Sequence, residues 1–334
     1  MNQQSNFILD RKNTQQLKGF AILLVLLGHT GMINFAGAYG VSIFLLVSGY
    51  GLAQSYLKNG TYQFLSKRID KVLVPYFIIT LIWFVIDYFV YHISYPWRDI
   101  AYTLFGLKFQ SQIDPSMWYI TFLLMWYFAF YLIFSLPLKN FMKVILIFLT
   151  ILLFERHTTL FTNASGAQIY LFEFPVGVVL GLYLTKIKKL PKNYIFALLL
   201  IISIVSIMLF IVSLKNLDLD LIYAKYTAFF AGISAILLFS ILHILNMKVL
   251  NFINMLFEKL GSLSYEIYLI EFMVLMKYYS IFNIDNKWLK FIAFFVFMII
   301  VGYLYQKMVQ IIRRAFTKLL NPFNLNKFSI EENK

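Results

Sequence analysis

The chain has 334 residues, of which 61% are hydrophobic and 13% are charged, and its mean hydropathy is +0.76. A soluble domain carries about 25% charged residues, so the composition excludes an ordinary soluble fold. The apolar runs are also too long and unalternating for a transmembrane β-barrel. Cysteine is absent, which excludes disulfides, cysteine-ligated zinc and iron–sulfur clusters. The sequence predicts an all-α, polytopic membrane protein.

The net charge of +14 comes from lysines and arginines in short connectors between apolar runs. This distribution is typical of a membrane protein that sets its orientation by charge, and it argues against a nucleic-acid partner. We expect the lipid bilayer to be the main surroundings of the chain. No bound metal or cofactor is expected.

Apolar runs of about 20 residues predict ten membrane spans. They lie near 18–35, 39–57, 73–93, 116–137, 142–156, 168–186, 194–213, 222–246, 260–278 and 288–312. Residues 1–320 are therefore expected to form one transmembrane domain, and residues 321–334 a polar cytoplasmic tail. If the N-terminus is cytoplasmic, 21 of the 29 lysines and arginines fall on the cytoplasmic side and 8 outside. The positive-inside rule thus predicts that both termini are cytoplasmic.

The first apolar run, Leu17–Thr30, carries Lys18 at its entrance and His29 eleven residues later. In a helix this separation is about 16 Å, which places a titratable side chain deep in the membrane, where such groups are costly. His29 could bridge two helices by a hydrogen bond, or it could act as a general base. Gly28 beside it would let a substrate or a neighbouring backbone approach closely.

The second run contains the block Ser48-Gly49-Tyr50, whose small residues would also suit tight helix packing. The segment that follows, Phe64–Tyr76, is expected to be a cytoplasmic loop that holds Arg68 and Lys71. These two cations could simply set the topology, or they could bind phosphate groups.

Four motifs resemble the acyltransferase 3 family of membrane acyltransferases. They are K-x10-H in the first run, GVSIFLLVSGY, F-x-x-K-R-x-x-K, and GSLSYEIYLIE near residue 270. The resemblance implies ten spans and transfer of an acyl group, commonly acetyl, from acyl-coenzyme A to sugars of surface polysaccharides. It also implies a bacterial cytoplasmic membrane as the location.

The resemblance assigns roles residue by residue. His29 matches the histidine of the family's first span, and Lys18, Arg68 and Lys71 match its basic, donor-binding residues. Further motif positions fall on Ser48, Gly49, Tyr50, Trp118, Ser264, Tyr265 and Tyr268. Three positions depart from the pattern: Lys18 and Lys71 stand for arginines, which loses bidentate geometry, and Glu271 stands for a histidine. The last change puts in doubt any role that needs an imidazole there.

Geometry adds a hypothesis about Glu271. It lies about eleven residues from the cytoplasmic end of the ninth predicted span, as His29 does in the first, so both side chains are expected at similar depth. We therefore expect Glu271 to contact or orient His29, as a carboxylate does in other acyl-transfer sites. The alternative partners of Glu271 are Tyr265 and Lys277.

Two other acidic residues fall within predicted spans. Glu173 is a candidate for binding the acceptor, although its position near the outer end of its span would also let it be solvated. Asp87 lies in the third predicted span, and the sequence names no partner for it.

The sequence therefore predicts an acyltransferase that uses acyl-CoA, most simply acetyl-CoA, as co-substrate from the cytoplasm. Its acceptor would be a hydroxyl of a polysaccharide or of a lipid-linked sugar. The competing interpretation is a transporter or flippase for a glycan or lipid precursor, in which the buried His and Glu relay protons. A third is an inactive partner in a polysaccharide-synthesis complex.

Overall fold

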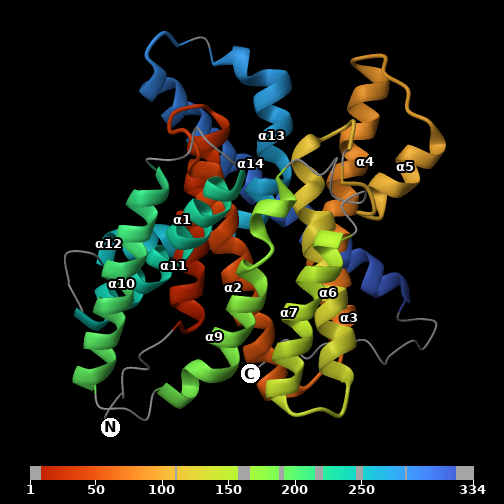
Figure 1. The fold of residues 1–334 in the computed structure, drawn as a ribbon. Coiled ribbons are helices and arrows are strands. Elements are labelled where there is room, and N and C mark those ends of the chain that lie inside the picture. Colours follow the sequence, from red (N-terminus) through yellow and green to blue (C-terminus); the bar gives the residue numbers. More distant parts are fainter. Residues whose placement is uncertain are drawn as a thin grey trace.

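The computed structural model describes residues 9–109, 111–156, 166–187, 192–214, 221–245, 251–282 and 284–320. All regular structure within these ranges is helical (Figure 1). The helices are α1 Arg11–His29, α2 Ala36–Asn59, α3 Phe64–Arg68, α4 Val74–Phe89, α5 Trp97–Leu104, α6 Trp118–Ser135, α7 Asn140–Arg156, α9 Glu173–Ile187, α10 Lys192–Leu214, α11 Leu221–Leu245, α12 Asn251–Ser262, α13 Ser264–Tyr278 and α14 Lys287–Leu320.

A helix occupies most of each predicted span, but several predicted bounds are wrong. The first helix begins at Arg11 and ends at His29, so it does not reach residue 35. The ninth span is broken, because α12 ends at Ser262 and α13 begins at Ser264. In the described part of the chain, four helices are long and apolar enough to cross a membrane. These are Ala36–Asn59, Phe64–Phe89, Pro115–Ser135 and Lys287–Thr317. The count of ten spans stays a prediction.

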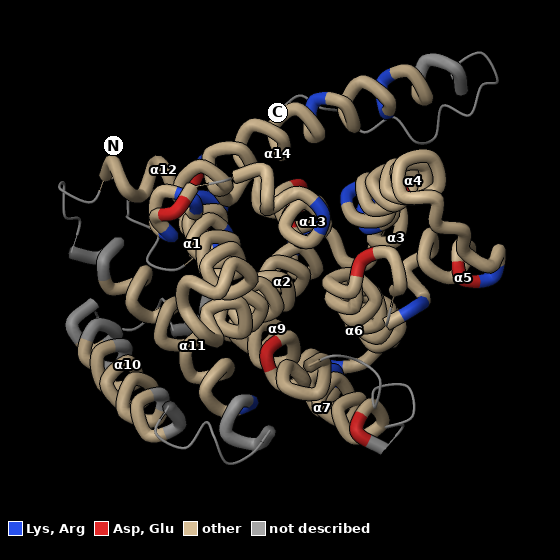
Figure 2. The backbone as a smooth tube through the Cα atoms, turned by 90° about the horizontal axis from the view of Figure 1, so that it is seen from above, with Lys and Arg blue, Asp and Glu red and all other residues tan. Residues whose placement is uncertain are grey.

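Helix α2 is the centre of the bundle. It packs against α1, α9 and α11, and α10 packs on the far side of α11 (Figure 2). The crossing of α2 and α9 is close because each helix presents a glycine. A Cβ on Gly49 would lie 2.2 Å from the carbonyl oxygen of Phe174, and a Cβ on Gly177 would lie 2.1 Å from that of Leu46. Any larger residue at either position would push the two helices apart.

One face of α6 builds an aromatic core. Phe122, Trp126, Phe130 and Phe134 are four residues apart, so they share one side of the helix, and each is at most 2% exposed. Trp126 stacks on Phe174 of α9, with ring centroids 5.2 Å apart. This packing holds α6 beside α9 and fixes the start of α6, which borders the site described below.

The segment expected to be a cytoplasmic loop is helical instead. Residues 64–68 form α3, and a π-helical turn, Ile69–Leu73, joins it to α4. Pro75 explains the wider turn, because it has no N–H for the carbonyl four residues earlier. Tyr265 donates a hydrogen bond to the carbonyl of Val72 at 2.8 Å, and Tyr305 donates to that of Pro75. The turn is therefore tied to α13 and α14.

Candidate active site

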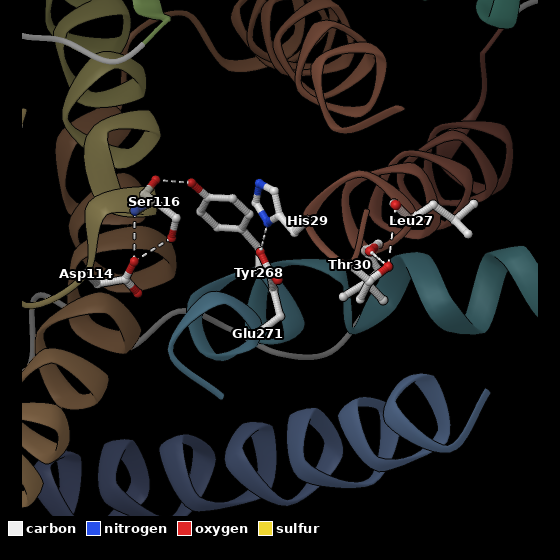
Figure 3. A network of polar contacts seen from close by, with 8 residues as sticks. Leu27, His29, Thr30, Asp114, Ser116, Tyr268 and Glu271 are labelled. Atoms are coloured by element: carbon white, nitrogen blue, oxygen red, sulfur yellow. Dashed lines mark hydrogen bonds and ion pairs between the residues drawn. The ribbon is translucent and has the colours of Figure 1, made fainter. Parts of the chain in front are cut away.

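His29 and Glu271 form a buried pair. The distance between His29 Nδ1 and Glu271 Oε1 is 2.6 Å (Figure 3). The Glu271 side chain is fully buried and that of His29 is 28% exposed. The contact hypothesised from the depth of the two residues is thus present. Both alternative partners are engaged elsewhere, since Tyr265 bonds to Val72 and Lys277 pairs with Asp87.

The bond to Glu271 determines which nitrogen of His29 is available. A neutral imidazole that donates Nδ1–H to a carboxylate keeps its lone pair on Nε2. Nε2 faces Gly37 at the start of α2, where a Cβ would lie 3.9 Å from it. The ring of Phe272 meets the imidazole edge-on, with centroids 5.1 Å apart. The arrangement leaves a basic nitrogen beside a residue that has no side chain.

Gly28 allows a neighbouring backbone to approach closely, which is one of the two roles predicted for it. A Cβ on Gly28 would lie 2.3 Å from the backbone nitrogen of Gly37. The helices α1 and α2 therefore touch backbone to backbone next to His29, and a larger residue at Gly28 would displace the histidine relative to Gly37.

The loop before α6 supplies a residue that the sequence analysis missed. Asp114 is 3% exposed, and its Oδ1 accepts hydrogen bonds from Ser116 N at 2.8 Å and Ser116 Oγ at 2.7 Å. The hydroxyl of Tyr268 donates to the carbonyl of Ser116, which ties this loop to α13 one turn before Glu271 (Figure 3). An aspartate at the edge of a span looks like a solvated residue, so no sequence pattern points to it.

Burial raises the pKa of the Asp114 carboxyl to about 7. The two hydrogen bonds from Ser116 lower this pKa, and so does His29, but they offset only part of the effect of burial. The negative charge of Glu271 raises it further. Asp114 and the His29–Glu271 pair therefore belong to one electrostatic unit.

A polar cavity of about 870 Å³ opens next to this unit. The three predicted donor-binding residues, Lys18, Arg68 and Lys71, all line it. Two cations that were not predicted, Arg11 and Arg313, line it as well. No sequence pattern points to Arg313, because only the fold brings α14 against the turn that carries Lys71.

The cations of the cavity are short of negative partners. Among the described residues, Lys18, Arg68 and Lys71 have no carboxylate oxygen within 4.0 Å, whereas Arg313 pairs with Asp70 at 3.2 Å. The guanidinium of Arg68 lies between the rings of Phe64 and Tyr127, 5.7 and 5.6 Å from their centroids. Unpaired like charges around a cavity repel one another and attract an anion of matching size.

The cavity ends close to the His29–Glu271 pair. Tyr119 and Tyr268 line it, and their ring centroids are 5.2 Å apart. Glu271 lies three residues beyond Tyr268 on α13, which is about 4.5 Å along the helix axis. A long ligand with an anionic end among the cations could therefore extend toward the pair.

The remaining motif residues support the site. Ser48 lines the cavity and hydrogen-bonds to Tyr127 at 2.8 Å. Tyr50 donates to the carbonyl of Leu9 at 3.0 Å, and Trp118 stacks on Tyr170 with centroids 5.7 Å apart. Ser264 also lines the cavity and bonds to the carbonyl of Gly261 at 2.8 Å, where α13 begins.

Two acidic residues of the predicted spans lie away from the cavity. Glu173 is the first residue of α9, is fully buried and does not line the polar cavity. An acceptor would reach it only if the surrounding helices separated. Asp87 bonds to Lys277 and accepts a hydrogen bond from Tyr95 at 2.7 Å, so it joins α4 to α13.

Comparison with known proteins decides the family. A family model described as an acyltransferase domain, Acyl_transf_3, matches residues 13–307. The chain belongs to the acyltransferase 3 family. Neither the curated proteins nor the solved structures give a match. The matched range contains His29, Glu271 and the three predicted donor-binding cations, and it supports a membrane acyltransferase in general terms.

Proposed function

We propose that this acyltransferase moves an acetyl group from acetyl-CoA to a hydroxyl of a polysaccharide or lipid-linked sugar. The observation that carries the proposal is the His29–Glu271 pair, one helical turn from a cavity lined by unpaired cations. The charge distribution along the chain favours a cytoplasmic location for the cations, and hence a bacterial cytoplasmic membrane protein that takes its donor from inside the cell.

The donor would bind by its phosphates. Arg68, Lys71 and Lys18 offer a guanidinium and two ammonium groups, which bind phosphate well. The pantetheine arm would then follow the cavity past Ser48 toward Tyr119 and Tyr268. This path places the thioester next to His29 while the nucleotide stays among the cations.

The chemistry would be general-base catalysis by His29. Nε2 takes the proton of the acceptor hydroxyl as its oxygen attacks the thioester carbonyl. The C–S bond then breaks, and the imidazolium returns the proton to the leaving thiolate, giving an ester and free coenzyme A. Glu271 would keep Nδ1–H in place and stabilise the imidazolium.

The test uses the purified full-length protein in nanodiscs with acetyl-CoA. Turnover should be lost in His29→Ala and retained in His92→Ala, which changes an exposed histidine between α4 and α5. Turnover that survives His29→Ala would exclude the general base. If the wild type binds no coenzyme A at all, the transporter interpretation becomes the better one.

A further inference from the structure

A second cavity, of about 480 Å³, lies on the other side of Arg68. It is formed by α3, the π-helical turn, α6 and the loop after α5. Leu73, Leu124, Met125 and Phe128 are among the apolar side chains that line it. We call it the apolar cleft. Arg68 and Tyr127 line both cavities, so these two side chains form the wall between them.

The apolar cleft opens sideways from the bundle. Side chains at its edge are exposed, among them Phe105 at 60%, Leu107 at 66% and Phe128 at 59%. In a protein of this composition such side chains face hydrocarbon rather than water. Gly106 allows the loop to lie against α6, since a Cβ there would be 2.8 Å from Leu124 Cδ1. The cleft is therefore a built feature of the fold and is accessible from the lipid.

One end of the cleft carries a positive charge without a carboxylate partner in the described structure. Arg68 Nε is buried and has no hydrogen-bond partner there. A buried donor without a partner costs free energy and points to a missing acceptor. Arg68 is the fifth residue of the apolar stretch Phe64–Phe89, about 6 Å from its start. If the start of that stretch lies at the cytoplasmic membrane surface, as the charge distribution predicts, Arg68 lies close to the lipid headgroups.

We propose that the apolar cleft binds an anionic phospholipid of the cytoplasmic leaflet. One acyl chain would lie along α6 between Met125 and the loop after α5, and the phosphate would accept a hydrogen bond from Arg68 Nε. The terminal amino groups of the same guanidinium would remain for the phosphate of the donor. The acetyl donor is a poor occupant, because the thioester has to reach His29 through the polar cavity on the other side of Tyr127.

Native mass spectrometry of the full-length protein in detergent tests the proposal. The probes are phosphatidylglycerol and phosphatidylcholine with identical acyl chains. Wild type should retain phosphatidylglycerol at least about tenfold more strongly, which corresponds to one charge-assisted phosphate contact. Equal retention of the two lipids, or stronger retention of phosphatidylcholine, would overturn the assignment of the phosphate to Arg68.

Variants locate the bound lipid. Met125→Trp fills the cleft and should weaken phosphatidylglycerol binding about tenfold by displacing buried methylenes. Leu132→Trp is the matched control: it adds the same side chain to an exposed position of α6 that does not line the cleft, and it should leave binding unchanged. Arg68→Gln should remove the preference for the anionic lipid while retaining the chain. Equal effects of the two tryptophans would place the lipid elsewhere and overturn the proposal.

The measurement is independent of the proposed acyltransferase chemistry. Met125 does not line the polar cavity, so Met125→Trp should bind coenzyme A as the wild type does. Loss of lipid without loss of coenzyme A supports the cleft. Wild type that binds lipid but no coenzyme A would contradict the proposed function alone.

Discussion

The His29–Glu271 pair and the polar cavity next to it differ in how their charged groups are partnered. The pair is buried and depends on a single hydrogen bond of 2.6 Å. The cavity collects five cations from different parts of the chain, four of which have no carboxylate partner among the described residues. In the pair, no other residue can replace either member. In the cavity, several cations share the attraction for an anionic ligand.

Substitutions in the pair and in the cavity should therefore change different kinetic constants. Removing one member of the pair should change the rate of the chemical step, because the interaction is needed most in the transition state. Removing one cation should change donor affinity by a limited factor, because the others remain. Variants of the pair and of the cavity should therefore differ in which kinetic constant changes and by how much.

His29→Ala should lower kcat by about a thousandfold, the usual contribution of a general base. The KM for acetyl-CoA should change little, since His29 does not line the polar cavity. Steady-state kinetics of the purified protein measure both constants. A variant that loses donor affinity instead of rate would show that the pair and the cavity are not separate in function.

Glu271→Gln should lower kcat by about a hundredfold. The amide oxygen can still accept Nδ1–H, but the imidazolium loses the negative charge beside it. The variant Glu271→Ala combined with His29→Ala gives a double-mutant cycle. If the two residues act as a pair, the double variant should be hardly slower than His29→Ala. Additive effects would disprove the pairing in catalysis.

Arg68→Ala should raise the KM for acetyl-CoA about tenfold and leave kcat nearly unchanged, the effect of losing one charge-assisted phosphate contact. Lys18→Ala and Lys71→Ala should each have a smaller effect, because an ammonium cannot form the bidentate contact of a guanidinium. Lys108→Ala is the control, since Lys108 pairs with Asp99 at 2.8 Å and does not line the polar cavity. A large fall in kcat in Arg68→Ala would contradict the view that several cations of the cavity share the binding of the donor.

Two tyrosines of α13 distinguish the pair from the cavity, because both line the cavity and both donate to a backbone carbonyl. Tyr268 bonds to the loop of Asp114, next to the pair, and Tyr265 bonds to the turn that carries Lys71. Tyr268→Phe should lower kcat about fivefold, and Tyr265→Phe should raise the donor KM by a similar factor, each from one lost hydrogen bond. Identical effects of the two variants would indicate only a general loss of packing.

Several parts of the site could be predicted from the sequence for a physical reason. The long apolar runs predict the helices. The contact between His29 and Glu271 is predicted from their equal depth, because a helix has a fixed rise per residue. Lys18, Arg68 and Lys71 meet in one cavity, as expected for residues near one membrane surface. The family assignment is confirmed by the match over residues 13–307.

Other parts could not be predicted, since they depend on contacts between distant segments. The helical form of 64–73 follows from a π-helical turn that Tyr265 and Tyr305 hold from other helices. Asp114 joins the site only because its loop folds inward to Tyr268. The pairing of Asp87 with Lys277 removes a candidate partner of Glu271, and their separation of 190 residues hides it from sequence patterns.

Asp114→Asn should give the smallest effect, visible as a change in the pH dependence of stability. The folded protein keeps the Asp114 proton up to a pH of about 7, whereas an unfolded chain releases it near the ordinary pKa of 3.8. The folded state therefore holds one proton more across this range, so Asp114 makes stability fall as the pH rises through it. Asparagine removes that contribution.

Thermal denaturation of the two proteins in detergent, from about pH 5 to about pH 8, measures the difference. The apparent Tm of the wild type should fall more steeply with rising pH than that of Asp114→Asn, and the two curves should become parallel above the folded pKa. Asparagine can still accept the two hydrogen bonds from Ser116, so the loop should stay in place. Curves that are parallel over the whole range would mean that Asp114 is ionised in the fold, and the loop would then contribute a full negative charge beside Glu271.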